Sequence, residues 1–265
     1  MSKKFESEQE FHNRWAENIP LEDLRVRESF ESPTALENRF ALERMGDLRG
    51  KRILDLGCGA GETAVYFSLA GAEVTGCDIS ERSLEVGEAL AGKFGTKVRW
   101  VHGSASSLAA RDSSFDLVYA NGVLHHVRLS AALKEVRRVL APGGTAVFIE
   151  PLAYNPVINV YRKMAAGVRS EFEQPLRRAQ IEKIRTFFPS FERREFWLFS
   201  LLIFLHFFFV RRWHPSKVRY WKKVIDEGQA YRGMIGFLEK LDRGLLRIFP
   251  FLGWWCWNTV IVVQK

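Results

Sequence analysis

The sequence feature that most constrains the fold is a short apolar run followed at once by three glycines. Residues 53–61 read ILDLGCGAG, and a helical pattern begins at Glu62. A strand that turns through glycines into a helix is typical of doubly wound α/β sheets, because glycine allows a tight turn and a close approach of ligand to backbone. The sequence therefore predicts a ligand site at the carboxyl end of this strand.

The region around this motif repeats the same alternation. Between residues 50 and 151, short β-branched runs alternate with helical patterns, as in a parallel sheet joined by crossover helices. We expect strands at 52–56, 73–78, 98–102, 115–120 and 145–149, and helices at 62–69, 83–94 and 130–140. The run Ala141-Pro142-Gly143-Gly144 is expected to end the last helix.

Two flanking regions complete the predicted domain organisation. Residues 1–49 are expected to form a helical cap, with one amphipathic helix around Phe11 and Trp15. A second helix is expected to start at Ser32-Pro33 and to run to about Met45. Residues 50–151 form the core, and residues 152–265 form a helical region that faces the substrate or a membrane. This last region also contributes two predicted strands, at 191–199 and 258–263.

Charge and aromatic residues divide the chain into two unlike halves. Residues 1–150 contain 19 Lys and Arg against 22 Asp and Glu, whereas residues 151–265 contain 20 against 9, a net charge of +11. Of the 35 aromatic residues, 23 lie in the second half. A basic, aromatic-rich half indicates an anionic partner, either nucleic acid or an acidic membrane surface.

The segment 196–210, FWLFSLLIFLHFFFV, is apolar on every side. As a helix it would reach only about 22 Å, short of the roughly 30 Å core of a bilayer, so no transmembrane span is expected. A basic amphipathic stretch, a helical apolar stripe and a tryptophan cluster follow it. Two interpretations are open here: the segment caps the sheet and buries its aromatic residues, or it docks on a membrane surface.

The cysteines and the first residues favour a reducing, cytoplasmic setting. Cys58, Cys77 and Cys256 lie far apart without a CxxC pair, which argues against a disulfide framework and a zinc knuckle. The opening MSKKFESEQEF has no apolar stretch of the kind found in a secretory signal. We therefore expect a cytoplasmic protein that associates peripherally with the membrane.

Acidic residues around the glycines argue against a dinucleotide site. The dinucleotide fingerprint is GxGxxG, but here the third glycine comes one residue early, at Gly61, and Glu62 follows it. An acidic side chain there would face a pyrophosphate. Asp55 suits a cationic amino group instead, and Asp78, 23 residues later, can accept both hydroxyls of a ribose.

Together these residues resemble the class I S-adenosylmethionine-dependent methyltransferases. The resemblance rests on LDLGCGAG, GCDIS, FDLVYANGVLHHV and VRRVLAPGGTAVFIEP, and it covers about 40% of the chain. It points to the broad subgroup that includes quinone, sterol and small-molecule methyltransferases. It implies an α/β, Rossmann-like sheet of about seven strands with a closing antiparallel hairpin and a C-terminal helical, aromatic-rich insertion.

The resemblance also implies which residues bind the cofactor, S-adenosylmethionine, at its methionine end. Gly57, Gly59 and Gly61 would cradle the methionine part, and Asp55 would orient its amino group. Asn121, at the end of the fourth strand, would line the methionine end and the entrance for the acceptor.

At the adenosine end, the resemblance implies that Asp78 holds the ribose and that Ile79 packs on the adenine. Ser104 and Ala105 follow the third strand, where the family often places an acidic residue that accepts from the adenine amino group. Ser104 departs from that pattern because it is not acidic. Its hydroxyl can still accept a hydrogen bond, but more weakly.

Three residues are candidates for catalysis. His125 and His126 follow the fourth strand, and either could take a proton from an acceptor hydroxyl. The alternative role for the pair is to pack and orient the loop. Glu150 could act as a base or could anchor a loop. Some quinone O-methyltransferases carry a Glu-x-x-Glu-His metal set at this place, but both glutamates are missing from residues 122–126, so no metal is expected.

The leading hypothesis is a methyltransferase for a lipid-like or hydrophobic acceptor at an anionic membrane surface. The alternative is a soluble small-molecule methyltransferase whose second half is a substrate lid. A nucleic-acid methyltransferase is disfavoured, because the fourth strand ends in ANGV, not in an NPPY-type signature, and because the basic residues alternate with bulky apolar ones. A membrane scaffold that only binds the cofactor is the remaining reading.

Overall fold

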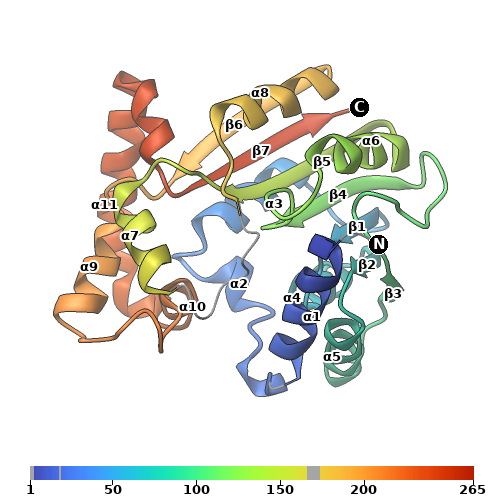
Figure 1. Cartoon of the computed structure of the whole chain (residues 1–265), viewed down its shortest axis with the longest axis horizontal. Helices are drawn as coiled ribbons and strands as arrows, with labels where there is room; N and C mark the ends of the chain where they lie inside the picture. Colours follow the sequence, from blue (N-terminus) through green and yellow to red (C-terminus); the bar gives the residue numbers. More distant parts are fainter. Residues whose placement is uncertain (1–2, 18, 166–173) are drawn as a thin grey trace.

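The computed structural model describes residues 3–17, 19–165 and 174–265 (Figure 1). In these residues seven strands form one sheet in the order β3-β2-β1-β4-β5-β7-β6. Strands β1 to β5 pair in parallel, and β7 pairs antiparallel with both β5 and β6. The predicted doubly wound sheet with a closing antiparallel hairpin is confirmed. The strands are β1 (Arg52–Leu56), β2 (Glu73–Asp78), β3 (Arg99–His102), β4 (Phe115–Asn121), β5 (Leu140–Pro151), β6 (Ser190–Phe196) and β7 (Asn258–Gln264).

Helices cover both faces of the sheet and extend beyond one end of it (Figure 1). In the core these are α4 (Glu62–Leu69), α5 (Glu81–Lys93) and α6 (Leu129–Val139). Before the core come α1 (Lys3–Ala16), η1 (Leu21–Asp23), α2 (Glu28–Glu31) and α3 (Leu36–Met45). After it come α7 (Pro156–Met164), α8 (Arg178–Phe187), α9 (Leu202–Phe209), α10 (Tyr220–Asp226), α11 (Gly228–Ile248) and η3 (Pro250–Trp255). The boundaries of the three expected domains stay a prediction.

Strand side chains alternate between two hydrophobic layers, as the twofold period of a strand requires. Ile53 and Tyr119 pack with Phe40 of α3 and the aromatic side chains of α9 and α10. Leu54 and Val118 point the other way and pack with α6 and α8. The central strands are buried on both faces, which is why they read as continuous apolar runs.

Three predicted element boundaries were wrong by three or more residues, each for a local reason. Helix α3 begins at Leu36, not at Ser32-Pro33, because Ser32 ends α2 and its hydroxyl lies 2.9 Å from that of Thr34. Strand β5 begins at Leu140 and includes the expected break at 141–144, next to an irregularity in its pairing with β4. Strand β6 ends at Phe196, since Trp197 takes a positive φ of 68°.

The chain reverses after β6 around a buried carboxylate of α11. Asp242 is 4% exposed and accepts hydrogen bonds from the backbone N–H groups of Leu198, Phe199 and Ser200 at 2.7–3.1 Å. The Ser200 hydroxyl donates to the same carboxylate at 2.7 Å. These bonds fix α11 to the end of the sheet.

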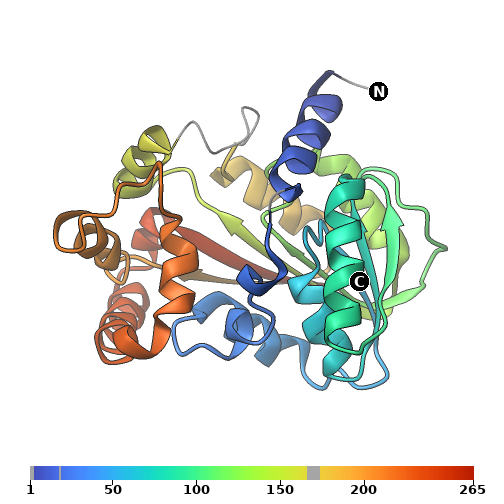
Figure 2. The same ribbon diagram turned by 90° about the horizontal axis from the view of Figure 1, so that it is seen from below.

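Segments from the two ends of the sequence pack against each other below the sheet (Figure 2). Arg25 forms an ion pair with Asp226 of α10 at 2.7 Å. The Thr34 hydroxyl donates to the carbonyl of Val224 at 2.6 Å. The N-terminal and C-terminal regions therefore form a joint layer beside the ligand-binding edge.

Among the described residues, no helix has the length and apolar character needed to cross a membrane. The three cysteines are buried free thiols.

The Trp100 indole fills a space that three glycines leave open. A Cβ placed on Gly61, Gly76 or Gly87 would lie 2.6–2.8 Å from carbon atoms of this ring. Such distances are too short for real contacts, and a ring of this size has little room to move in a packed core. Gly61 is therefore needed for packing as well as for the turn, because a side chain there would overlap the Trp100 ring.

This packing predicts that Gly87→Ala destabilises the protein, although alanine usually stabilises a helix relative to glycine. Overpacking in a core costs about 1–3 kcal/mol. Urea unfolding should show a loss of this order. The same substitution in a Trp100→Leu background should cost clearly less, because the smaller side chain frees the space. An equal cost in both backgrounds would contradict the role given to Trp100.

Candidate active site

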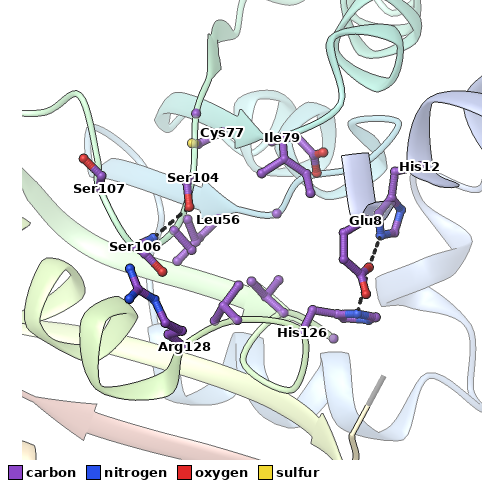
Figure 3. A pocket seen from close by; sticks show the side chains of 17 residues that line it. Glu8, His12, Leu56, Cys77, Ile79, Ser104, Ser106, Ser107, His126 and Arg128 are labelled. Atoms are coloured by element: carbon purple, nitrogen blue, oxygen red, sulfur yellow. Dashed lines mark hydrogen bonds and ion pairs between the residues drawn. The ribbon is translucent and has the colours of Figure 1, made fainter. Parts of the chain in front are cut away.

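The carboxyl ends of β1, β2 and β4 meet at one edge of the sheet and open into a cavity of about 530 Å³ (Figure 3). Parallel α/β sheets bind ligands at this edge, where the strand order reverses. The cavity is lined by Glu8, His12, Leu56, Gly57, Cys77, Asp78, Ile79, Gly103, Ser104, Ala105, Ser106, Ser107, Gly122, Val123, His126, Val127 and Arg128.

Asp78 connects the glycine turn to the end of β2. Its Oδ2 accepts from the Gly59 N–H at 2.8 Å, and its Oδ1 accepts from the Ser80 N–H at 2.9 Å. Each carboxylate oxygen has a second lone pair, so Asp78 keeps acceptor capacity toward the cavity that it lines. This geometry suits a ligand with neighbouring hydroxyls.

The glycine turn needs its glycines for conformation and for space. Gly57 has a φ of 68°, and a Cβ there would lie 2.4 Å from a methyl group of Val123. Gly59 also has a positive φ, of 50°, and nothing lies within 4 Å of where its Cβ would be. The backbone at Gly59 is thus open to a ligand, although neither Gly59 nor Gly61 lines the cavity of Figure 3.

Asp55 is a buried carboxyl group that the described part of the chain satisfies only in part. It is 2% exposed, and its Oδ2 has no hydrogen-bond partner among the described residues. Burial raises its pKa to about 8, with a further contribution from the negative charge of Asp78. A buried polar oxygen without a donor is unfavourable, and a ligand ammonium group would satisfy it.

The predicted adenosine contacts lie together in the cavity. Ile79, Ser104 and Ala105 all line it, and Ile79 and Ser104 lie on the side opposite His126 in Figure 3. The Ser104 hydroxyl accepts from the N–H of Ser106 at 3.2 Å. Its roles as an adenine contact and as a local turn former are compatible, because the hydroxyl oxygen has a second lone pair that can accept from the adenine amino group.

Asn121 lies elsewhere. Its side chain is exposed, donates to the Tyr119 hydroxyl at 3.4 Å, and is not part of the cavity lining. Tyr119 in turn donates to Asn38 of α3 at 2.8 Å. The structure thus places Asn121 at the α3 side of the strand end, away from the predicted adenosine contacts.

Glu150 holds the loop that follows β4. It is fully buried, and its carboxylate accepts from the backbone N–H groups of Val123 and Leu124 at 3.0 and 2.6 Å. Its Oε2 also lies 2.7 Å from His125 Nδ1. This geometry favours the loop-anchor role, and it orients His125 as a buried partner.

His126 faces the cavity together with two residues that sequence reasoning missed. His126 Nδ1 lies 3.2 Å from Glu8 Oε2, and His12 Nε2 lies 3.6 Å from the same oxygen (Figure 3). Glu8 and His12 lie one helical turn apart on α1. That spacing was visible in the sequence, but the packing of α1 against α5 beside the cavity was not. The catalytic roles of His125, His126 and Glu150 stay predictions.

In the described ranges, no three or more His, Cys, Asp or Glu side chains are grouped so that they could hold a metal ion.

Comparison with known proteins gives consistent results. Residues 54–148 match the sequence model of a methyltransferase domain. The demethylmenaquinone methyltransferase of Staphylococcus aureus is 38% identical over 142 residues, which are 52% of this chain and 57% of that protein. The chain thus spans just over half the length of the curated relatives that it matches.

Solved structures share the fold. A methyltransferase from Thermotoga maritima aligns with a TM-score of 0.55 and 17% identity, covering 98% of this chain and 99% of that one. The YcgJ protein of Bacillus subtilis aligns with a TM-score of 0.56 and 20% identity, over 88% and 97% of the two chains. The fold of the chain is that of the class I S-adenosylmethionine-dependent methyltransferases, and residues 54–148 match a methyltransferase domain. The predicted resemblance to these methyltransferases is confirmed. S-adenosylmethionine is the cofactor of this class.

The residues present fit this cofactor. The unsatisfied oxygen of Asp55 suits its ammonium group, the open backbone at Gly59 admits its methionine part, and Asp78 suits its ribose. Ile79 offers an apolar surface for the adenine. These assignments to individual residues are proposals that the geometry supports.

The raised pKa of Asp55 predicts a protein that loses stability as the pH rises. The pKa is about 8 in the folded chain against a reference of 3.8, so the folded state keeps a proton that the unfolded state releases. This contribution is complete below the unfolded pKa and falls by up to about 1.4 kcal/mol per pH unit until the folded pKa is passed.

Asp55→Asn should therefore reduce the decline in unfolding free energy between about pH 5 and 8, measured by urea unfolding of the ligand-free protein. Asp47→Asn is the matched control, because the pKa of that exposed carboxyl is lowered to about 2. Identical pH slopes for the wild type and Asp55→Asn would contradict the prediction.

Proposed function

We propose that this protein is an S-adenosylmethionine-dependent methyltransferase that acts on a hydrophobic, lipid-like acceptor at the cytoplasmic membrane surface. The methyltransferase part rests on the domain match and on the fit of Asp55 and Asp78 to the cofactor. The acceptor class is supported by the relative named as a demethylmenaquinone methyltransferase. The observation that carries the membrane part is the exposed apolar end of the molecule.

This apolar end is formed by exposed side chains of α7, α9, α11 and η3. The helices α7, α9 and α11 lie together at the left of Figure 1. Phe209, Phe237 and Phe251 are 69%, 68% and 64% exposed. Large exposed apolar side chains on a soluble domain mark interaction sites. The other members of the group are Val160, Leu202, Leu205, Val210, Met234, Leu241, Ile248, Phe249 and Trp255.

The charge of the same end suits an anionic surface. Residues 196–255 contain ten Lys and Arg against four Asp and Glu. Arg212, Arg232 and Arg247 are exposed on or beside the same helices. Each basic residue near an anionic leaflet contributes about 1 kcal/mol of attraction, so apolar insertion and charge would act together.

The cap interpretation is also supported for part of this region. Phe204, Phe207 and Tyr220 are buried against one another and against the main core. The helices therefore use one side to cover the sheet and leave the other side exposed. A soluble enzyme with a helical lid is the alternative that this buried side favours.

Methyl transfer requires mainly that the protein aligns the methyl donor with the acceptor. Bound S-adenosylmethionine supplies an electrophilic methyl group on a sulfonium, which transfers by in-line displacement. The chain's residues would hold the donor at Asp55 and Asp78, exclude water, and present the acceptor from the opposite side. The joint layer formed by the N-terminal and C-terminal regions is suited to excluding water.

His126 is the candidate general base if the acceptor is a hydroxyl. Its ring is half-buried at the cavity, and its Nδ1 faces the Glu8 carboxylate. A neighbouring carboxylate stabilises the imidazolium that forms when the ring takes a proton. Glu150 would act only as an anchor, because its oxygens are already bonded to the loop that it holds.

Incubation with methyl-labelled S-adenosylmethionine and a total membrane lipid extract should transfer label into the organic phase. Asp78→Ala should abolish the transfer, because it removes the bridge to Gly59 and the proposed ribose contact. Lys97→Ala serves as a surface control. An empty organic phase, in a preparation that binds S-adenosylhomocysteine, would refute the lipid acceptor and direct the search to soluble extracts.

The protein should co-sediment with anionic phosphatidylglycerol liposomes, and salt should weaken the association. Phe237→Ser should weaken it further, by about tenfold or more, because one buried Phe contributes roughly 1.5–3 kcal/mol. Leu69→Ser is the matched control, since Leu69 is also exposed but lies on α4. Equal recovery in the supernatant with and without liposomes would contradict membrane docking.

A further inference from the structure

A second cavity, of about 310 Å³, lies where the N-terminal and C-terminal regions meet at the far end of the glycine turn. Gly57 of this turn lines the first cavity, and Glu62, directly after the turn, lines the second. The two cavities therefore flank the same loop. The lining residues of the second are Trp15, Ile19, Pro20, Asp23, Leu24, Arg25, Ser29, Glu62, Arg219, Trp221, Lys222 and Ile225.

Arg219 is the distinctive residue of this cavity. Its guanidinium lies 5.2 Å from the centre of the Trp15 ring. Among the described residues it has no ion pair, and its side chain has no hydrogen bond. Burial lowers the pKa of Arg219, but a guanidinium stays charged at neutral pH. A partly buried guanidinium that packs on an aromatic ring but has no hydrogen-bond acceptor among the described residues is energetically unfavourable.

The other cations of the cavity already have partners. Arg25 pairs with Asp226 at 2.7 Å, and Lys222 lies 3.8 Å from Asp23. Neither acid of the lining neutralises Arg219. Glu62 accepts from the backbone N–H of Arg25, and burial raises the pKa of the Glu62 carboxyl. The positive charge that remains in the cavity is that of Arg219.

Apolar and aromatic side chains form much of the wall beside Arg219. Trp15, Leu24 and Ile225 give apolar and aromatic surface around the guanidinium. Trp221 also lines the cavity, and its side chain is 46% exposed to solvent. Arginine holds carboxylates and phosphates through paired, directional hydrogen bonds, and it does so more strongly in a desolvated site.

We propose that this second cavity binds a carboxylate or phosphate group through Arg219, with the apolar part of the ligand against Trp15. The group would come either from the methionine part of the cofactor or from an acidic acceptor. The proposal rests on the proposed function in its choice of ligands, and it assigns to α10 and the segment before it a role in ligand selection.

Isothermal titration tests this with wild type, Arg219→Gln and Arg219→Lys. The probes are S-adenosylhomocysteine, 5′-methylthioadenosine, which lacks the carboxylate, octyl phosphate and uncharged octyl glucoside. Arg219→Gln should weaken one anionic probe by about tenfold or more, the effect of losing a charge-assisted hydrogen bond. Arg219→Lys should recover part of the loss. Arg137→Gln, with the same charge change on the exposed side of α6, should have no effect.

The pattern of losses identifies the source of the anion. A loss for S-adenosylhomocysteine but not for 5′-methylthioadenosine assigns Arg219 to the cofactor carboxylate. A loss for octyl phosphate alone assigns it to the acceptor. Unchanged affinity for both anionic probes in Arg219→Gln, with an unchanged melting temperature, overturns the proposal. Failure of the wild type to bind S-adenosylhomocysteine would instead contradict the proposed function, and octyl phosphate would still test Arg219.

Discussion

A buried carboxylate must find donors, and this requirement organises the ligand-binding edge of the sheet. Glu150, on β5, is satisfied by backbone N–H groups of the loop after β4 and so fixes that loop. Asp78, at the end of β2, is satisfied by the glycine turn and by Ser80. Asp55, on β1, keeps one oxygen without a donor among the described residues. Two of these acids build the site, and the third leaves an oxygen that a hydrogen-bond donor of the ligand can satisfy.

The core was predictable because its signals are local. The central strands β1, β4 and β5 carry their own apolar runs, and the glycines after β1 have positive φ values that favour glycine. The same holds for Asp78, whose position follows from the end of a strand. A predicted boundary was wrong where a group distant in the sequence holds the backbone: Asp242 of α11 accepts from the residues that follow β6, where the sequence predicts that the strand continues.

The residues that sequence reasoning missed are those brought in by packing over long sequence separations. Glu8 and His12 reach the first cavity because α1 packs on α5, and Arg219 reaches the second because α10 packs under α2. No periodicity or motif signals either arrangement. The buried and exposed sides of α9 were also inseparable in the sequence, since a helix that is apolar all round gives no face.

Phe196 and Asn258 are register partners in the β6–β7 hairpin. Residues 197–257 thus leave the sheet and return to it at one point, as an insertion in a hairpin does. Insertions of this kind can change in length without altering strand order. Here, however, Phe204, Phe207 and Ile235 belong to the same packed layer as Phe40. A shortened version would need another cover for that layer, so the segment can diversify at its outer surface more readily than it can be removed.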